Sequence, residues 1–230
     1  MTDRHIVAMG GFGLSLERPA LLDFALGLTG RDRPSVCFVP TASADRDEAT
    51  TGFYRAISGK GDGRDLPLFA RTVQDLRAFV LDHDVVYVAG GNTANALAVW
   101  RAHGLDAVLR EAWESGVVMC GASAGANCWF QASSTDSFGP DLAPLHDGLG
   151  FLAGGFCPHY DGEVRRRPRL HEFVAAGFPD CYAADNFSAT HFVGTELAEA
   201  IASNDGATVY RVTGGPDGVQ EEALPTRLLR

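Results

Sequence analysis

The sequence lacks a surplus of positive charge. Its 230 residues include 19 lysines and arginines against 29 aspartates and glutamates, which gives a formal net charge of -10 at pH 7. Nucleic acids and anionic membrane surfaces are bound by clustered basic side chains. We therefore expect neither a nucleic acid nor a membrane as the main partner. A small anionic substrate remains compatible with this charge, because one arginine can reverse the field inside a pocket.

Long apolar runs are missing as well. The apolar run near the start covers only residues 6–9, which is too short for a signal peptide or a membrane span. The cysteines have the spacing of neither a zinc site nor a disulfide framework, and no H-E-x-x-H motif occurs. We therefore expect a cytoplasmic protein with reduced thiols and with no metal or other cofactor. The five cysteines are Cys37, Cys120, Cys128, Cys157 and Cys181.

The sequence does contain short apolar runs that alternate with longer amphipathic stretches. Four runs are rich in valine and end at glycine or proline, as buried parallel strands do. These runs cover residues 5–11, 35–42, 85–91 and 116–121. Helical spacing of apolar residues occurs over 18–28, 73–81, 93–103 and 106–115. Strands that alternate with helices indicate βαβ units and a parallel sheet covered on both faces.

The last third of the sequence is richer in strand patterns. These patterns cover residues 181–193, 207–212 and 221–229. We interpret them as a β-rich extension of the same unit. The prediction is one α/β domain over residues 1–230, folded as a three-layer α/β/α sandwich with a mostly parallel sheet. The oligomeric state is left open, although a homo-oligomer is compatible with the sequence.

The strongest chemical signal is the glycine-rich segment at residues 121–127, which reads GASAGAN. It follows a predicted strand and precedes a helical stretch, which is the context that a G-x-S-x-G nucleophile elbow requires. Such a turn holds the serine hydroxyl out at the edge of the sheet, and the helix that follows aims free N–H groups at the site. Ser123 is therefore the candidate nucleophile, and the Ala124 N–H is a candidate oxyanion donor.

A second glycine turn, Gly90 and Gly91, ends another predicted strand and precedes a helix. Ligands of open parallel sheets bind beyond the carboxyl ends of the strands, so both turns should face one crevice. We expect the N–H groups near Gly90 and Gly91 to complete an oxyanion hole. A phosphate-binding turn or a plain tight turn has the same composition, and the pairing with Ser123 favours the oxyanion role.

A serine nucleophile needs a base to accept its proton. Three of the seven histidines lie outside clearly solvated contexts: His159, His171 and His191. His159 comes just after an apolar, glycine-flanked run, where the end of a strand would place it near the crevice, so it is the preferred base. His191 is the rival, and it lies in an alternating strand pattern that is also typical of a half-buried sheet histidine.

The third member of a triad should be a carboxylate that accepts from the other imidazole nitrogen. Asp136 lies between the nucleophile and the base in the sequence and is the preferred candidate. An Asp beside Ser and Thr is also common as a helix cap or in an Asx turn. The sequence alone leaves four rivals open: Asp141, Asp161, Glu163 and Asp185.

Taken in order, these segments resemble the motifs of the peptidase E (α-aspartyl dipeptidase) family of serine peptidases. The resemblance rests on Gly-Gly-Asn-Thr at residues 90–93, the serine motif at 121–127, Pro-His at 158–159 and Gly-Glu-Val-Arg at 162–165. It covers roughly residues 5–212. It implies a fold like that of the class I glutamine amidotransferases, with serine in place of cysteine.

The resemblance also implies roles for individual residues. Ser123 matches the nucleophile of the family, His159 its base, and Asp136 most nearly its acid. Arg165 matches the arginine that holds the side-chain carboxylate of an N-terminal aspartate in the substrate. Arginines also follow at residues 166, 167 and 169, so the sequence leaves open which of them points inward.

The resemblance therefore predicts a dipeptidase that removes an N-terminal aspartate from short peptides through an acyl-enzyme. Two alternatives remain. One is a different serine hydrolase on the same scaffold, such as a broader aminopeptidase, a cyanophycinase-like enzyme or an esterase. The other is a binding module that has lost catalysis, which the joint presence of serine, histidine and acid candidates disfavours.

Overall fold

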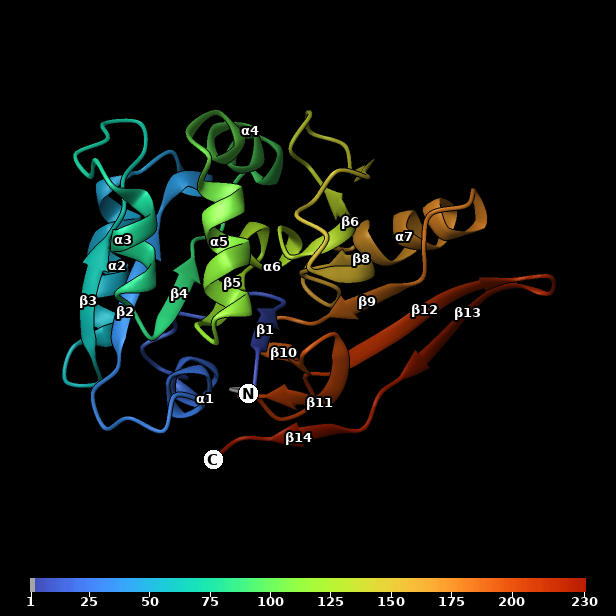
Figure 1. Ribbon diagram of the computed structural model, residues 1–230. Helices are drawn as coiled ribbons and strands as arrows, with labels where there is room; N and C mark the ends of the chain where they lie inside the picture. Colours follow the sequence, from blue (N-terminus) through green and yellow to red (C-terminus); the bar gives the residue numbers. More distant parts are fainter. Residues whose placement is uncertain (1–2) are drawn as a thin grey trace.

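Figure 1 shows the computed structural model of the protein, which describes residues 3–230. An eight-stranded sheet forms one half of the molecule. Five of its strands are parallel: β1 (His5–Met9), β5 (Val118–Ala122), β4 (Val85–Val88), β2 (Ser35–Val39) and β3 (Asp62–Asp65). Beyond β1, the sheet continues through antiparallel β10 (Ser188–Val193) and β11 (Glu196–Ala202) to β14 (Thr226–Leu228).

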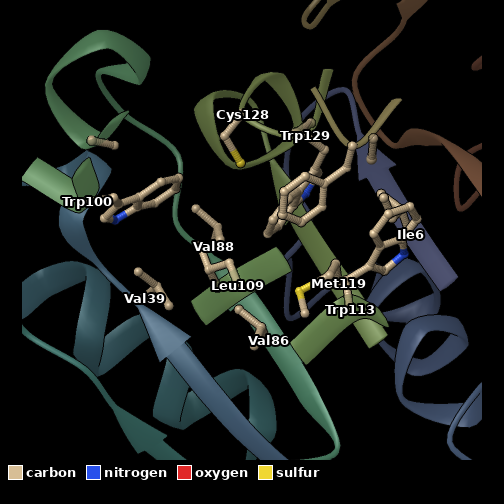
Figure 2. Close-up of a cluster of buried hydrophobic side chains, with 14 of the residues drawn as sticks. Ile6, Val39, Val86, Val88, Trp100, Leu109, Trp113, Met119, Cys128 and Trp129 are labelled. Carbon is tan, nitrogen blue, oxygen red and sulfur yellow. The ribbon is translucent and has the colours of Figure 1, made fainter. Parts of the chain in front are cut away.

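Helices cover both faces of this sheet. One face carries α3 (Leu76–Leu81), α4 (Thr93–His103) and α5 (Leu105–Glu114), and the other carries α1 (Ala20–Gly27) and α2 (Asp47–Ile57). Successive side chains of a strand point to opposite faces. In β4, Val86 and Val88 accordingly pack beside Trp100 of α4 and Leu109 of α5 (Figure 2), whereas Tyr87 packs in the cluster of α1 and α2. The predicted three-layer sandwich is confirmed.

The rest of the chain builds a second, six-stranded sheet, which the sequence patterns did not separate from the first. Its order is β13 (Gly218–Ala223), β12 (Val209–Gly215), β9 (Cys181–Ala184), β8 (Leu152–Cys157), β6 (Phe130–Thr135) and β7 (Ala143–Leu145). Helix α7 (Arg166–Ala175) packs against β12 and β13. The β12–β13 hairpin is the long red extension in Figure 1.

The strand predicted over 181–193 is in fact two strands in two different sheets. Phe187 has a backbone φ of 64° and ends the extended conformation between β9 and β10. The Ser188 N–H donates to the Asp185 carbonyl at 3.1 Å, which closes the turn. The predicted strand over 221–229 divides in the same way, into β13 and β14. The polypeptide therefore passes from one sheet to the other at these turns.

The two sheets share one hydrophobic core. Phe130 of β6 and Phe156 of β8 stack with their ring centroids 5.0 Å apart, and Phe130 also meets Phe192 of β10 edge to face at 5.8 Å. These rings belong to the same buried cluster as Ile6 and Met119 of the first sheet. The carboxyl ends of strands from both sheets are thereby held in a fixed relation. Among residues 3–230, no helix is long and apolar enough to cross a membrane.

Candidate active site

Ser123 occupies a sharp turn between β5 and the short helix α6 (Ala124–Asn127). Its φ of 58° and ψ of -116° are rare for a residue with a side chain, and such strain costs about 1–3 kcal/mol. Neighbouring bonds hold the turn: the Ser123 N–H donates to Met9 O at 3.1 Å, and its carbonyl accepts from the Asn127 N–H at 2.9 Å. A Cβ at Gly125 would collide with Val88 O, so this position must be glycine.

The second glycine turn lies beside the serine. A Cβ on Gly90 would lie 3.4 Å from the Ser123 Cβ, whereas one on Gly91 would collide with Ala42 O. Within residues 3–230, the N–H groups of Gly90 and Gly91 donate to no protein oxygen. Ala124 is the first residue of α6, so its N–H has no acceptor inside the helix. Gly90 and Ala124 thus border Ser123, and Gly91 lies one residue further out.

His159 follows β8 and lies at the same end of the first sheet as Ser123. A Cβ on Gly11, which comes just after β1, would lie 2.6 Å from the His159 Nδ1, so Gly11 allows the imidazole to approach β1 closely. Burial lowers the pKa of His159 below its ordinary value, and the nearby positive charge of Arg166 acts in the same direction. Both effects favour the neutral ring, and the hydrogen bond to Asn186 opposes them. Within residues 3–230, no hydrogen bond joins the His159 imidazole to the Ser123 hydroxyl. In many enzymes the hydrogen bond between nucleophile and base shortens only when substrate binds.

Asn186, not a carboxylate, bonds to the imidazole. Its Oδ1 lies 2.7 Å from the His159 Nδ1, so the amide oxygen accepts the Nδ1 proton and Nε2 is left with a free lone pair. The Asn186 N–H in turn donates to Asp161 Oδ1 at 2.8 Å. This is the arrangement of a Cys-His-Asn protease, in which an amide orients the base. Asp161, one of the rival acids, acts here only through Asn186.

Within residues 3–230 no hydrogen bond joins Asp136 to His159, although the negative charge of Asp136 acts to raise the pKa of the imidazole. Asp136 is exposed, and its carboxylate makes no hydrogen bond within residues 3–230. Its neighbours tie the segment to α4: the Ser137 hydroxyl accepts from the Ala94 N–H at 3.2 Å, and the Ser137 carbonyl accepts from Asn92 Nδ2 at 3.0 Å. The bond that we expected from Asp136 to the base is made by Asn186 instead.

Two further rival acids, Glu163 and Asp185, have partners other than His159. Glu163 forms an ion pair with Arg166. Asp185 is buried, and its Oδ2 accepts from the Thr208 N–H at 3.0 Å while its Oδ1 has no partner in the described part of the chain. Burial raises the pKa of Asp185 to about 6. Asp185 is adjacent in sequence to Asn186, but no hydrogen bond joins it to His159 within residues 3–230.

The arginine run faces two directions. Arg165, the residue expected to hold a substrate carboxylate, is exposed and pairs with Asp141 at 2.8 Å and with Pro140 O at 3.1 Å. The buried arginine is Arg166, whose guanidinium binds both oxygens of Glu163 at 2.8 and 3.2 Å. The inward-facing member of the run is therefore one residue later than the motif indicates.

Asn186 was not predicted from the sequence, because residues 181–193 have the pattern of a single strand. β8 and β9 are adjacent and parallel, so the residues after their carboxyl ends lie side by side. His159 follows β8 and Asn186 follows β9. A strand end placed before Asp185-Asn186 would have brought this amide next to the base.

A cavity of about 570 Å³ opens beside Ser123. Its floor and walls are apolar, from Leu14, Phe38, Tyr87 and Ala89, and Gly90 and Ser123 close one side. The serine is therefore reached through a hollow large enough for a side chain.

A family model for peptidase family S51 matches residues 6–200. The chain belongs to peptidase family S51. The uncharacterized peptidase YgaJ of Bacillus subtilis (strain 168) is 45% identical to it over 230 residues, covering 98% of this chain and 99% of the relative. Peptidase E of Streptomyces coelicolor is 31% identical over 152 residues, which cover 60% of each chain.

Two solved structures have a similar fold. A peptidase from an acI-B1 Actinobacterium superposes with a TM-score of 0.69 at 17% identity, covering 96% of this chain and 95% of that one. A Listeria monocytogenes EGD-e protein assigned as a peptidase E gives a TM-score of 0.62 at 18% identity, covering 85% of this chain and 97% of that one. At this identity the likeness concerns the fold.

Proposed function

We propose that this S51 peptidase is a serine peptidase that cleaves short peptides through an acyl-enzyme on Ser123. His159 Nε2 accepts the hydroxyl proton as the oxygen attacks the scissile carbonyl. The N–H groups of Gly90, Gly91 and Ala124 stabilise the oxyanion, and His159 then returns the proton to the leaving amine. Water hydrolyses the ester by the same route. The observation that carries the proposal is the strained backbone of Ser123, because such strain is retained where surrounding structure and function require it.

In this mechanism Asn186 positions the base. The bond from His159 Nδ1 to Asn186 selects the tautomer whose Nε2 can accept a proton. An amide does this without adding charge, so it stabilises the imidazolium less than a carboxylate would. Asp185 is the alternative orienting group, and substitution of each residue separates the two.

For the substrate, we propose dipeptides with an N-terminal aspartate. The proposal draws on the four arginines that follow His159 and on a relative named peptidase E. A guanidinium binds a carboxylate in a bidentate manner, and truncation of one partner in a desolvated pair costs about 2–5 kcal/mol. Removal of a buried arginine that binds the substrate in this way would lower kcat/KM by about 30-fold or more.

One observation favours a second candidate, a peptidase of broader specificity. Arg165 is paired with Asp141 at the surface, and Arg166 is neutralised by Glu163. Neither guanidinium can bind a substrate carboxylate unless its present carboxylate partner is displaced. An enzyme with this arrangement would accept alanine as readily as aspartate at the first position.

The deciding experiment measures kcat/KM for Asp-Leu, Glu-Leu, Asn-Leu and Ala-Leu with the wild type and with Arg165→Ala and Arg166→Ala. The aspartate proposal requires a strong preference for Asp-Leu that one of the two variants abolishes. Equal cleavage of Ala-Leu and Asp-Leu by the wild type would establish the broader peptidase. Ser123→Ala serves as the control, and activity that survives in it would refute the serine mechanism itself.

We also propose a cytoplasmic location. All five cysteines are free and buried, which suits a reducing compartment.

A further inference from the structure

The cavity beside Ser123 is lined by polar as well as apolar residues. Arg46 and Glu48 are two of the polar ones, at the start of helix α2. Both side chains are exposed, so they are reachable from solvent. The first N–H groups of α2 have no acceptor within the helix, and they add positive potential at the same place.

Arg46 differs from most arginines of this acidic protein. Most of the others are paired with a carboxylate, as Arg77 is with Glu111 and Arg227 is with Glu199. Arg46 uses its Nε to donate to Ser43 O at 3.1 Å, which fixes the direction of the side chain. Within residues 3–230 its two terminal nitrogens have no acidic partner. A held guanidinium with two free donors is suited to a carboxylate from a ligand.

The position of the cavity indicates which part of a peptide it receives. The amine that leaves must lie beside His159, because His159 supplies its proton. Gly11 contacts the His159 ring, and the next residues along the chain, Phe12 and Leu14, line the cavity. The segment that borders the imidazole thus continues directly into residues that line the cavity. Phe12 is held there by a backbone φ of 56° and by stacking on Phe187, with ring centroids 4.8 Å apart.

We propose that this cavity binds the C-terminal residue of the substrate, with an apolar side chain against Leu14, Phe38 and Tyr87 and the α-carboxylate on Arg46. The inference rests on the proposed peptidase activity and deepens it. A residue bound in this way has to be the last of the chain. Together with the N-terminal aspartate of the proposed function, this restricts the substrate to dipeptides. Glu48 repels a second carboxylate, so a C-terminal Glu or Asp is disfavoured.

The test compares dipeptides with their C-terminal amides. For the X-Leu dipeptide that the wild type cleaves best, we expect amidation to lower kcat/KM by about tenfold or more, the range for hydrogen bonds to charged groups. In Arg46→Gln the ratio of acid to amide should fall close to one. Arg55→Gln is the matched control, because Arg55 is an exposed arginine of the same helix that does not line the cavity. It should keep the wild-type ratio.

Glu48→Gln sharpens the test. It should improve cleavage of X-Glu relative to X-Leu and leave the acid-to-amide ratio of X-Leu intact. The inference is overturned if the wild type cleaves the amide as fast as the acid, or if Arg46→Gln keeps the wild-type ratio while peptidase activity is normal. In that case the proposed function stands without the carboxylate site.

A binding measurement decides the case in which no peptide is cleaved. N-acetyl-L-leucine and N-acetyl-L-leucinamide represent the leaving residue, and their affinities for the intact protein are measured by calorimetry. Tighter binding of the acid that Arg46→Gln removes, and Arg55→Gln does not, supports the site even if the peptidase proposal fails. Equal binding of acid and amide refutes it.

Discussion

The two sheets build their halves of the candidate site in different ways. In the eight-stranded sheet, Ser123, Gly90 and Ala124 are placed by local rules: a strand ends, glycines allow a tight turn, and a helix begins. In the six-stranded sheet, His159 takes its place only through contacts with Asn186 and Gly11, which are distant in sequence. Local geometry is encoded in consecutive residues, whereas the base depends on several segments that meet.

The largest effect should come from the locally built half. Ser123→Ala should lower kcat by about 10⁴-fold or more, as the loss of a triad nucleophile does. The melting temperature should stay within a degree or two, because the hydroxyl is partly exposed and makes no hydrogen bond within residues 3–230. Kinetics with any cleaved dipeptide and a thermal melt check this. A large drop in stability would mean that the serine holds the turn rather than performs chemistry.

In the half of the site built on the six-stranded sheet, loss of a buried ion pair should lower the stability more than loss of an exposed one. Glu163→Ala leaves the buried Arg166 guanidinium without its carboxylate, and we expect a loss of about 2–4 kcal/mol in the free energy of unfolding. Asp141→Ala breaks the exposed pair with Arg165 and should cost about 0–1 kcal/mol. Urea denaturation of both variants measures the difference. Equal losses would show that burial does not distinguish the two pairs.

Positioning of the base gives a smaller expected effect on the rate. Asn186→Ala removes the acceptor for the Nδ1 proton and should lower kcat about 10-fold to 100-fold, since orienting partners of a histidine contribute on that scale. Asp136→Ala should leave kcat within about twofold, a change on the scale of a surface substitution. The reverse result would restore Asp136 as the orienting residue. A rate loss for Asp185→Ala alone would assign that role to Asp185.

The smallest expected effect concerns pH. Because burial lowers the pKa of His159, the ring stays neutral to a lower pH than a free imidazole does. The value of kcat/KM should fall only when the pH drops through that lowered pKa. Asn186→Asp places a negative charge beside the imidazole, which favours its protonated form and should shift the acidic limb upward by about one pH unit. A pH–rate profile of both proteins tests the sign. An unchanged limb would mean that another group controls it.

Much of the first sheet could be predicted from the sequence. The core strands and the helix over 93–103 were predicted because each has a clear apolar period and glycine at its end. The turn at Ser123 was predictable because strand, glycines and helix are consecutive. The three-layer sandwich around the first sheet was predictable because its strands and helices alternate along the sequence.

The second sheet escaped prediction for a physical reason. Phe187 adopts a left-handed backbone conformation that its residue type does not signal, so the break between β9 and β10 is invisible in the apolar pattern. The partner of His159 is set by the adjacency of β8 and β9, which no local period encodes. Which arginine is buried depends on how α7 packs, and a run of four arginines carries no such information.

The path of β10 has a consequence for how the chain is made. β10 pairs with β1, so that Ile6 lies opposite Phe192, yet most of the second sheet is synthesised between them. As the polypeptide leaves the ribosome, β1 therefore has an open edge until β10 has emerged. The turn at Ser123 can therefore form early, but the sheet around it is completed only when β10 pairs with β1, late in translation. No single cut in the chain separates the two sheets into pieces that each retain all their strands.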